Sequence, residues 1–98
     1  MSLALTPEQR AIVRDILQSH LPPSAKIWVF GSRATGGAKP FSDLDLAIDA
    51  ARPLTLDETA SLRDAFSESD LPWKVDVVDT HTIDAGFRQI ILTNAVRF

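Results

Sequence analysis

The sequence contains no cysteine, which excludes disulfide bonds and thiolate-bound zinc. Long hydrophobic runs are also missing, because the purely apolar stretches are only a few residues long and a membrane-spanning helix needs about 20. The first residues show neither the basic segment nor the apolar stretch of a secretory signal. We therefore expect a cytoplasmic protein that does not enter a membrane.

Positive charge is in short supply as well. The net charge is −3 and the pI is near 5.1, whereas a general nucleic-acid binder needs a basic surface to displace phosphate counterions. We therefore expect no direct nucleic-acid binding. A small anion such as a nucleoside triphosphate is compatible with this charge if divalent cations accompany it.

The length of 98 residues, 45% of them hydrophobic, fits one globular domain, which we expect to span residues 1–98. A core of this size leaves no room for a separate substrate-binding domain. Any further binding surface is therefore expected to come from a partner.

Two segments begin with the pattern of a helical capping box, Thr6 to Gln9 and Thr55 to Glu58. They predict helices over residues 7–20 and from residue 56 to about residue 69, and a third is expected over residues 83–93. The expected inward positions are Ile12, Val13, Ile16 and Leu17 in the first helix, Leu56, Ala60, Leu62 and Phe66 in the second, and Phe87, Ile90 and Ile91 in the third.

Strands are predicted at residues 26–30, 43–49 and 73–79, with a short strand at residues 96–98, and a helical turn is expected after Ser32. The second and third strands should be parallel because a helix connects them. Antiparallel pairing of the first two strands would place the end of one beside the start of the other. The sequence therefore predicts an α/β fold, a mixed β-sheet of about four strands flanked by about four helices.

The most informative motif is Gly31-Ser32, followed after ten residues by Asp43-Leu44-Asp45. Alternation along a strand puts both aspartates on one face and the intervening leucine on the other. A third acid, Asp76, lies in an apolar strand, where an unpaired carboxylate is costly. Three carboxylates beside a turn able to bind phosphate suggest a divalent metal site for phosphoryl chemistry.

Each of these residues also has a purely structural interpretation. Asp43 and Asp45 could be a loop cap and a solvated strand residue, and Gly31-Ser32 a simple turn. The nearby cations have two readings as well: Arg33 and Lys39 are either phosphate contacts or solvated charges, and Lys74 pairs either with Asp76 or with a triphosphate.

Four further residues are assigned structural roles by their context. His20 and His81 have no base or metal ligands nearby in sequence, so we expect them to be structural or exposed. Asp79 and Thr82 lie where the last helix begins, and we expect them to be caps. Two tryptophans, Trp28 and Trp73, are expected in core or rim packing, although either could form an apolar patch for a partner.

The Gly-Ser and Asp-Leu-Asp motif, with Val75-Asp76-Val77-Val78 as the third-acid strand, resembles the minimal nucleotidyltransferases (MNT), small members of the DNA polymerase β nucleotidyltransferase superfamily. The resemblance covers most of the chain. It implies a polymerase β-like nucleotidyltransferase fold and Mg²⁺-dependent transfer of a nucleoside monophosphate, with release of pyrophosphate.

The resemblance also implies roles for individual residues. Asp43 and Asp45 would hold the metal bound to the triphosphate, and Asp76 would complete a second metal site and activate the acceptor hydroxyl. Gly31 and Ser32 would bind phosphate oxygens. From its charge, and not from the resemblance, we also expect Arg33 to contact the phosphates.

Minimal members of this family are often antitoxins of a HEPN-domain RNase toxin, and some adenylylate a tyrosine on that toxin with ATP. The resemblance thus implies a protein adenylyltransferase whose partner is a HEPN toxin. Two alternatives remain open: an antitoxin that neutralises its partner by contact alone, and nucleotidyl transfer to a small molecule.

Overall fold

The computed structural model describes residues 5–36, 39 and 41–98. Within them the elements follow in the order α1 (Pro7–His20), β1 (Lys26–Phe30), α2 (Ser32–Thr35), β2 (Leu44–Asp49), α3 (Leu56–Ser67), β3 (Val75–Asp79), α4 (Ala85–Thr93) and β4 (Val96–Arg97). Of the helices described, none is long and apolar enough to span a membrane. The predicted helices and strands are thus all present, with ends that shift by a few residues.

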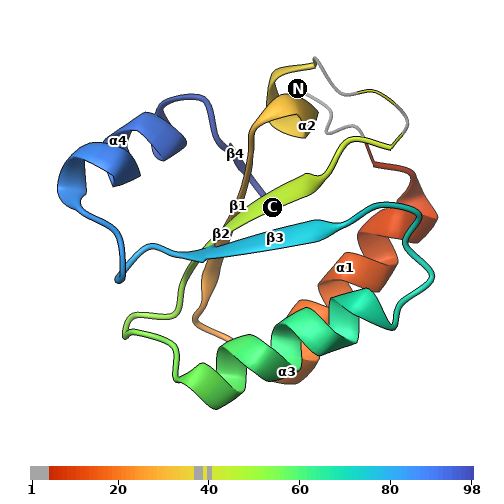
Figure 1. Ribbon diagram of the computed structural model, residues 1–98, viewed down its shortest axis with the longest axis horizontal. Coiled ribbons are helices and arrows are strands. Elements are labelled where there is room, and N and C mark those ends of the chain that lie inside the picture. Colours follow the sequence, from red (N-terminus) through yellow and green to blue (C-terminus); the bar gives the residue numbers. More distant parts are fainter. Residues whose placement is uncertain (1–4, 37–38, 40) are drawn as a thin grey trace.

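The four strands form one mixed sheet in the order β3-β2-β1-β4. β1 pairs antiparallel with both β2 and β4, whereas β2 and β3 are parallel and connected through α3. Both predicted pairings are confirmed. The end of β1 and the beginnings of β2 and β3 consequently meet at one edge of the sheet, where the Gly-Ser turn and the aspartates lie (Figure 1).

The core lies between the sheet and the pair of helices α1 and α3, which pack against each other (Figure 1). The predicted alternation of β2 is confirmed, since Leu44, Leu46 and Ile48 are fully buried. The remaining positions of this core cluster lie in α1 and just beyond its end, in β1, α2, α3 and β3, and shortly before β3: Val13, Leu17, Leu21, Ile27, Val29, Ala34, Leu62, Phe66, Trp73 and Val77.

Four residues expected to face inward are exposed instead. In α3 the core side chains are Leu62 and Phe66, four positions apart, whereas Leu56 is 89% exposed and Ala60 is exposed too. At about 100° per residue, both exposed positions lie more than 100° away from Leu62 around the helix. The burial pattern of α3 therefore follows a single narrow face.

The same correction applies to α4. Only Ile91 is buried there, while Ile90 is 72% and Phe87 is 47% exposed. Ile90 points about 100° away from its neighbour Ile91, whereas Phe87, one turn before Ile91, lies on nearly the same side of the helix and is exposed all the same. A helix with apolar residues on several sides gives no sequence signal for which of them face the core.

Both capping boxes form as predicted. In the second, Glu58 accepts from the backbone N–H of Thr55 and also forms a bidentate pair with Arg52, with both oxygens at 2.8 Å. The hydrogen bond and charge of Arg52 lower the pKa of Glu58 to about 2. The stability that comes from the ionised form is thus complete above the ordinary pKa of 4.5 and is lost as the pH falls through about 2.

We therefore expect Glu58→Gln, which keeps a side-chain acceptor for Thr55, to unfold at a lower urea concentration than wild type at pH 7. The difference should shrink steadily between pH 4.5 and pH 2. Urea titrations of both proteins at several pH values check this. A difference that stays constant down to pH 2 would show that the pair with Arg52 contributes nothing.

Candidate active site

Gly31 brings the backbone at the end of β1 against the first acid-bearing strand. Its neighbour Phe30 is paired with Asp45 across the antiparallel ladder. Gly31 itself has φ 73° and ψ −155°, a conformation that is essentially restricted to glycine. A Cβ atom at this position would overlap the carboxylate of Asp45. The glycine is therefore required twice, once by the backbone conformation and once by the approach of the carboxylate.

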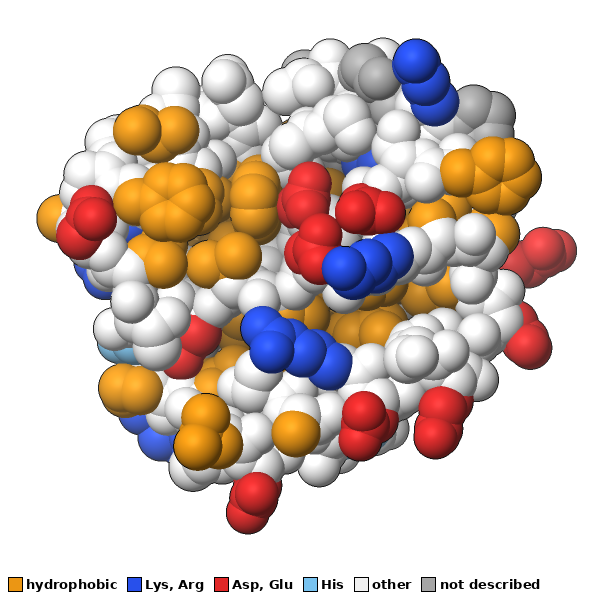
Figure 2. Space-filling view, viewed as in Figure 1, with side chains coloured by type: hydrophobic (Ala, Val, Ile, Leu, Met, Phe, Trp, Pro, Cys, Tyr) orange, Lys and Arg blue, Asp and Glu red, His pale blue; other side chains and the backbone are white. Residues whose placement is uncertain are grey.

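The three predicted acids lie together at this edge. Asp45 and Asp76 are direct partners in the parallel register of β2 and β3, so their side chains emerge on the same face of the sheet. Asp43 precedes Asp45 by two residues and is also close enough to act on it electrostatically. Figure 2 shows acidic side chains gathered at the centre of one face, next to basic ones.

The electrostatics of this cluster favour a cation. The pKa of the Asp45 carboxyl is raised by burial first and then by the negative charges of Asp76 and Asp43. Among the described residues, no group of three or more His, Asp or Glu side chains is already gathered closely enough to hold a metal ion. The donor set nevertheless fits Mg²⁺, since it consists of carboxylate oxygens whose mutual repulsion a divalent cation would relieve.

Ser32 begins the short helix α2 directly beside these acids. The carbonyl of Gly31 accepts hydrogen bonds from the N–H groups of Ala34 and Thr35, at 3.1 and 3.2 Å. This turns the chain so that the first residues of α2 stand over the end of β1. Because the first N–H groups of a helix have no partners within it, the turn suits contact with phosphate oxygens.

Arg33, the predicted phosphate contact, is buried in the structure. It is only 5% exposed, its Nε and Nη2 donate to the carbonyl of Ser42 at 3.0 and 2.9 Å, and its guanidinium stacks 4.3 Å from the ring centroid of Trp73. Contact of Arg33 with phosphate stays a prediction. Ser42 directly precedes Asp43, and Trp73 lies three residues before Asp76. Arg33 therefore holds together the segments that precede β2 and β3, the two strands that carry the acids.

The other nearby cations are exposed. Lys74 pairs with Asp76 at 3.8 Å, with side chains 75% and 46% exposed, so the pairing is weak and the lysine can turn toward another anion. Lys39 is exposed in the loop before β2, where its backbone carbonyl and N–H bond Ser42. The ion pair of Lys74 is therefore present, and contact of either lysine with a triphosphate stays a prediction.

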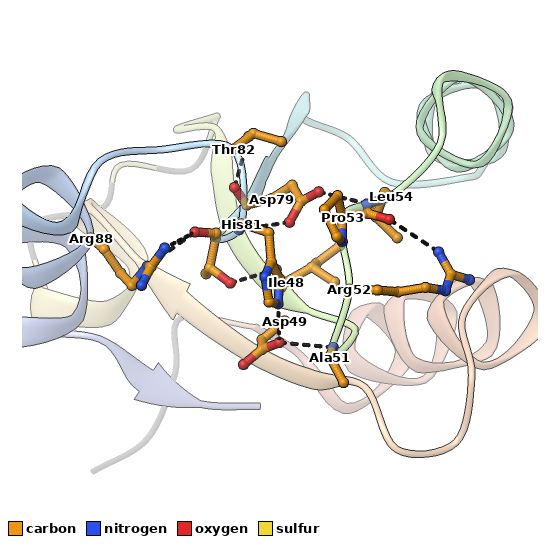
Figure 3. A network of polar contacts seen from close by, with 11 residues as sticks. Ile48, Asp49, Ala51, Arg52, Pro53, Leu54, Asp79, His81, Thr82 and Arg88 are labelled. Carbon is orange, nitrogen blue, oxygen red and sulfur yellow. Dashed lines mark hydrogen bonds and ion pairs between the residues drawn. The ribbon is translucent and has the colours of Figure 1, made fainter.

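A second polar network, at the opposite end of the sheet, was not foreseen from the sequence. His81 bonds Asp49 through Nε2 and Oδ1 at 2.8 Å, although the two residues are 32 positions apart. Asp79 accepts from the backbone N–H groups of Leu54 and His81, at 2.7 and 2.9 Å. Figure 3 shows how these contacts join the segments that follow β2 and β3.

This network corrects the expected caps of the last helix. The N-cap is Asp84, which accepts from the N–H of Phe87, while Asp79 holds the loop after β2. Thr82 bonds the carbonyl of Asp79 at 2.9 Å. Nearby, Arg88 donates to the carbonyl of Thr80 through two nitrogens, at 3.0 and 2.6 Å. The network thus fixes the far end of the sheet and lies away from the acids.

The fold and this arrangement of acids define a nucleotidyltransferase. The family model for "Polymerase beta, Nucleotidyltransferase" matches residues 12–97, and the chain belongs to this family. The match covers both acid-bearing strands and the Gly-Ser turn. It confirms the predicted superfamily and the expected class of enzyme.

Particular relatives extend the comparison. The chain is 51% identical over 89 residues to "Probable protein adenylyltransferase MntA" of Haemophilus influenzae, covering 91% of this chain and 77% of the relative. A crystal structure of a toxin-antitoxin with AMP-PNP is similar with a TM-score of 0.76 and 26% identity, over 89% of this chain and 69% of that one.

A second structure contains a tri-AMPylated Shewanella oneidensis HEPN toxin in complex with an MNT antitoxin. Its similarity has a TM-score of 0.66 at 23% identity, over 90% of this chain and 69% of that one. At this identity the likeness concerns the fold alone. It agrees with the four-stranded mixed sheet described above.

Proposed function

We propose that this protein is a cytoplasmic, Mg²⁺-dependent adenylyltransferase that moves AMP from ATP to a tyrosine hydroxyl of a HEPN toxin and acts as its antitoxin. The observation that carries the proposal is the placement of Asp45 and Asp76 as direct neighbours on one face of the sheet, with Gly31 against the first. The 51% identity to MntA, which is named a protein adenylyltransferase, supports the acceptor class. The unit that acts is proposed to be this single domain, without nucleic acid.

Within this proposal we assign each residue of the site a role. Asp43 and Asp45 would hold the metal on the triphosphate, and Asp76 would complete the second metal site. Divalent cations, when bound, would neutralise charge on the attacking and leaving oxygens. Ser32 and the backbone at Gly31 would hold phosphate oxygens in place, which leaves the acceptor side of the site beside Asp76.

Asp76 has a further task that its own chemistry supports. Its carboxylate is 46% exposed at the edge strand, so an incoming hydroxyl can reach it from solvent. A carboxylate beside the hydroxyl can accept its proton as the oxygen attacks phosphorus. The neighbouring Asp45, whose carboxylate lies against the backbone of Gly31, is left to hold the metal.

The test is to incubate the chain with its genomic neighbour, ATP and Mg²⁺, and to measure intact masses for added AMP. The 98 residues contain no tyrosine, so a modified tyrosine in the mixture belongs to the partner. We expect transfer by wild type and none by the double variant Asp43→Ala, Asp45→Ala. Addition that survives the double variant, or no addition at all, would refute the enzymatic proposal.

The same material separates catalysis from neutralisation by contact. Asp76→Asn keeps the size and most of the polarity of the side chain but removes the proton acceptor. We expect it to bind the partner as wild type does and to fail to neutralise it in cells. Full neutralisation by this variant would favour an antitoxin that acts by contact.

A further inference from the structure

β3 is an edge strand with an open side. It stands last in the strand order, paired only with β2 within the described residues, and no strand lies beyond it (Figure 1). The carbonyl of Lys74 accepts from the first residue of β2, and the N–H of Thr80 donates to Ile48. Because the direction of backbone groups alternates along a strand, the N–H and C=O groups of Val75 and Val77 point away from the sheet.

A groove runs along this open side. It lies between β3 and α3, has a volume of about 770 Å³, and is lined by Arg63 and Phe66 from α3 and by Trp73, Lys74 and Val75 at the strand. Figure 2 shows hydrophobic side chains in a hollow near the acidic group, with basic side chains at its rim. An extended chain placed in this groove would meet backbone donors and acceptors on one side and apolar surface on the other.

The groove is continuous with the active site through Asp76. Residues opposite one another on neighbouring strands share a face of the sheet, and Asp45 and Asp76 already form such a pair. A strand added beyond β3 would place a third residue in line with Asp45 and Asp76 across the sheet. Its residue opposite Asp76 would present its side chain on the face where the acids stand.

We propose that the acceptor segment of the partner protein binds as an added β-strand along the outer edge of β3, with its tyrosine in the row of Asp45 and Asp76. This inference rests on the proposed function, because it assigns the acceptor side of the same site. Edge strands are normally blocked by proline, bulges or covering loops, and β3 itself contains no proline. A second copy of this chain cannot be the acceptor, since it has no tyrosine.

A matched pair of variants tests the strand addition. Val75→Pro removes one outward N–H while leaving the ladder with β2 intact, as proline does on the open side of an edge strand. Val75→Ala also removes the packing of the valine side chain, as Val75→Pro does, but it keeps the N–H. We expect Val75→Pro to raise the KM for the partner by about tenfold or more. Val75→Ala should stay within about threefold of wild type, and ATP binding should be unchanged in both.

A second measurement does not depend on transfer. In the complex of the isotope-labelled chain with its partner, the amides of Val75 and Val77 should become protected from hydrogen exchange, as amides in a ladder are. Protection without transfer would uphold the docking and refute the adenylyltransfer. Two results together would overturn the docking alone: transfer by Val75→Pro at the level of Val75→Ala, and free exchange of the Val75 and Val77 amides in the complex of the wild-type chain.

Self-association is the remaining outcome. If the chain forms dimers that Val75→Pro disrupts while transfer to the partner is unaffected, the open edge pairs two copies of this chain, and the inference is wrong. Sedimentation of wild type and both variants, at the concentrations used for the kinetics, decides this.

Discussion

Gly31→Ala should reduce AMP transfer by at least about 100-fold, the size of effect that follows when a reacting group is displaced by about 1 Å. Two separate causes act together. The backbone of Gly31 has φ 73° and ψ −155°, which costs any other residue about 1–3 kcal/mol. In addition, the new methyl group would occupy the space of the Asp45 carboxylate, so either the strand end or the acid must move.

Gly36→Ala is the matched control. This glycine lies at the other end of α2, also with positive φ, at 88°, but a Cβ atom there would meet nothing within 4 Å. The control therefore carries backbone strain without displacing Asp45. Transfer rates under saturating ATP and melting temperatures should be measured for both variants. Equal loss of activity in the two would mean that strain around α2, rather than contact with the carboxylate, governs the site.

The sequence was sufficient to predict where the acids lie in the sheet, because this placement follows from the local alternation of apolar and acidic residues and from the order of the elements. Alternation in β2 fixed which side Asp43 and Asp45 take, and a helix between two strands implied the parallel pairing that brings Asp76 beside them. The fully buried Leu44 and Leu46 confirm the alternation. Each inference needed only neighbouring residues and the connection between strands.

The contacts that could not be predicted from the sequence join residues that are far apart along the chain. The sequence suggested only a phosphate contact or a solvated charge for Arg33, and no local pattern predicts that it stacks on Trp73, 40 residues later in the chain. The pair between His81 and Asp49 joins the turn after β3 to the end of β2, which no local pattern connects. Such contacts depend on where the strands end in space, which alternation and capping patterns do not specify.

The contacts of Arg33 show that residues outside the acid cluster also position the acids. The guanidinium holds the carbonyl of Ser42 on one side and the ring of Trp73 on the other. Both acid-bearing strands begin just beyond these two residues. Arg33 can thus set the spacing between Asp43 and Asp76 through the segments that precede them.

Asp45→Asn should abolish transfer and at the same time stabilise the metal-free protein. Transfer is expected to fall at least about 100-fold, because a metal ligand and its charge are lost. The melting temperature should rise by a few degrees, since the variant removes a partly buried negative charge that faces Asp76 and Asp43. Asp15→Asn, an exposed position on α1, makes the same change in net charge and should alter neither property.

The pH dependence of this gain has a definite sign. The pKa of Asp45 is raised above its ordinary value of 3.8 by burial and by the two neighbouring acids, so the cost of ionising it is absent at low pH and grows as the pH rises through the folded pKa. The stability advantage of Asp45→Asn should therefore be small near pH 3.8 and larger at pH 7. Mg²⁺ with ATP should raise the melting temperature of wild type more than that of the variant, because ligands stabilise the form that binds them. Thermal unfolding of both proteins at both pH values, with and without Mg²⁺ and ATP, measures these differences in melting temperature. A variant that is less stable than wild type at pH 7 would show that the acids are held apart without any need for a cation.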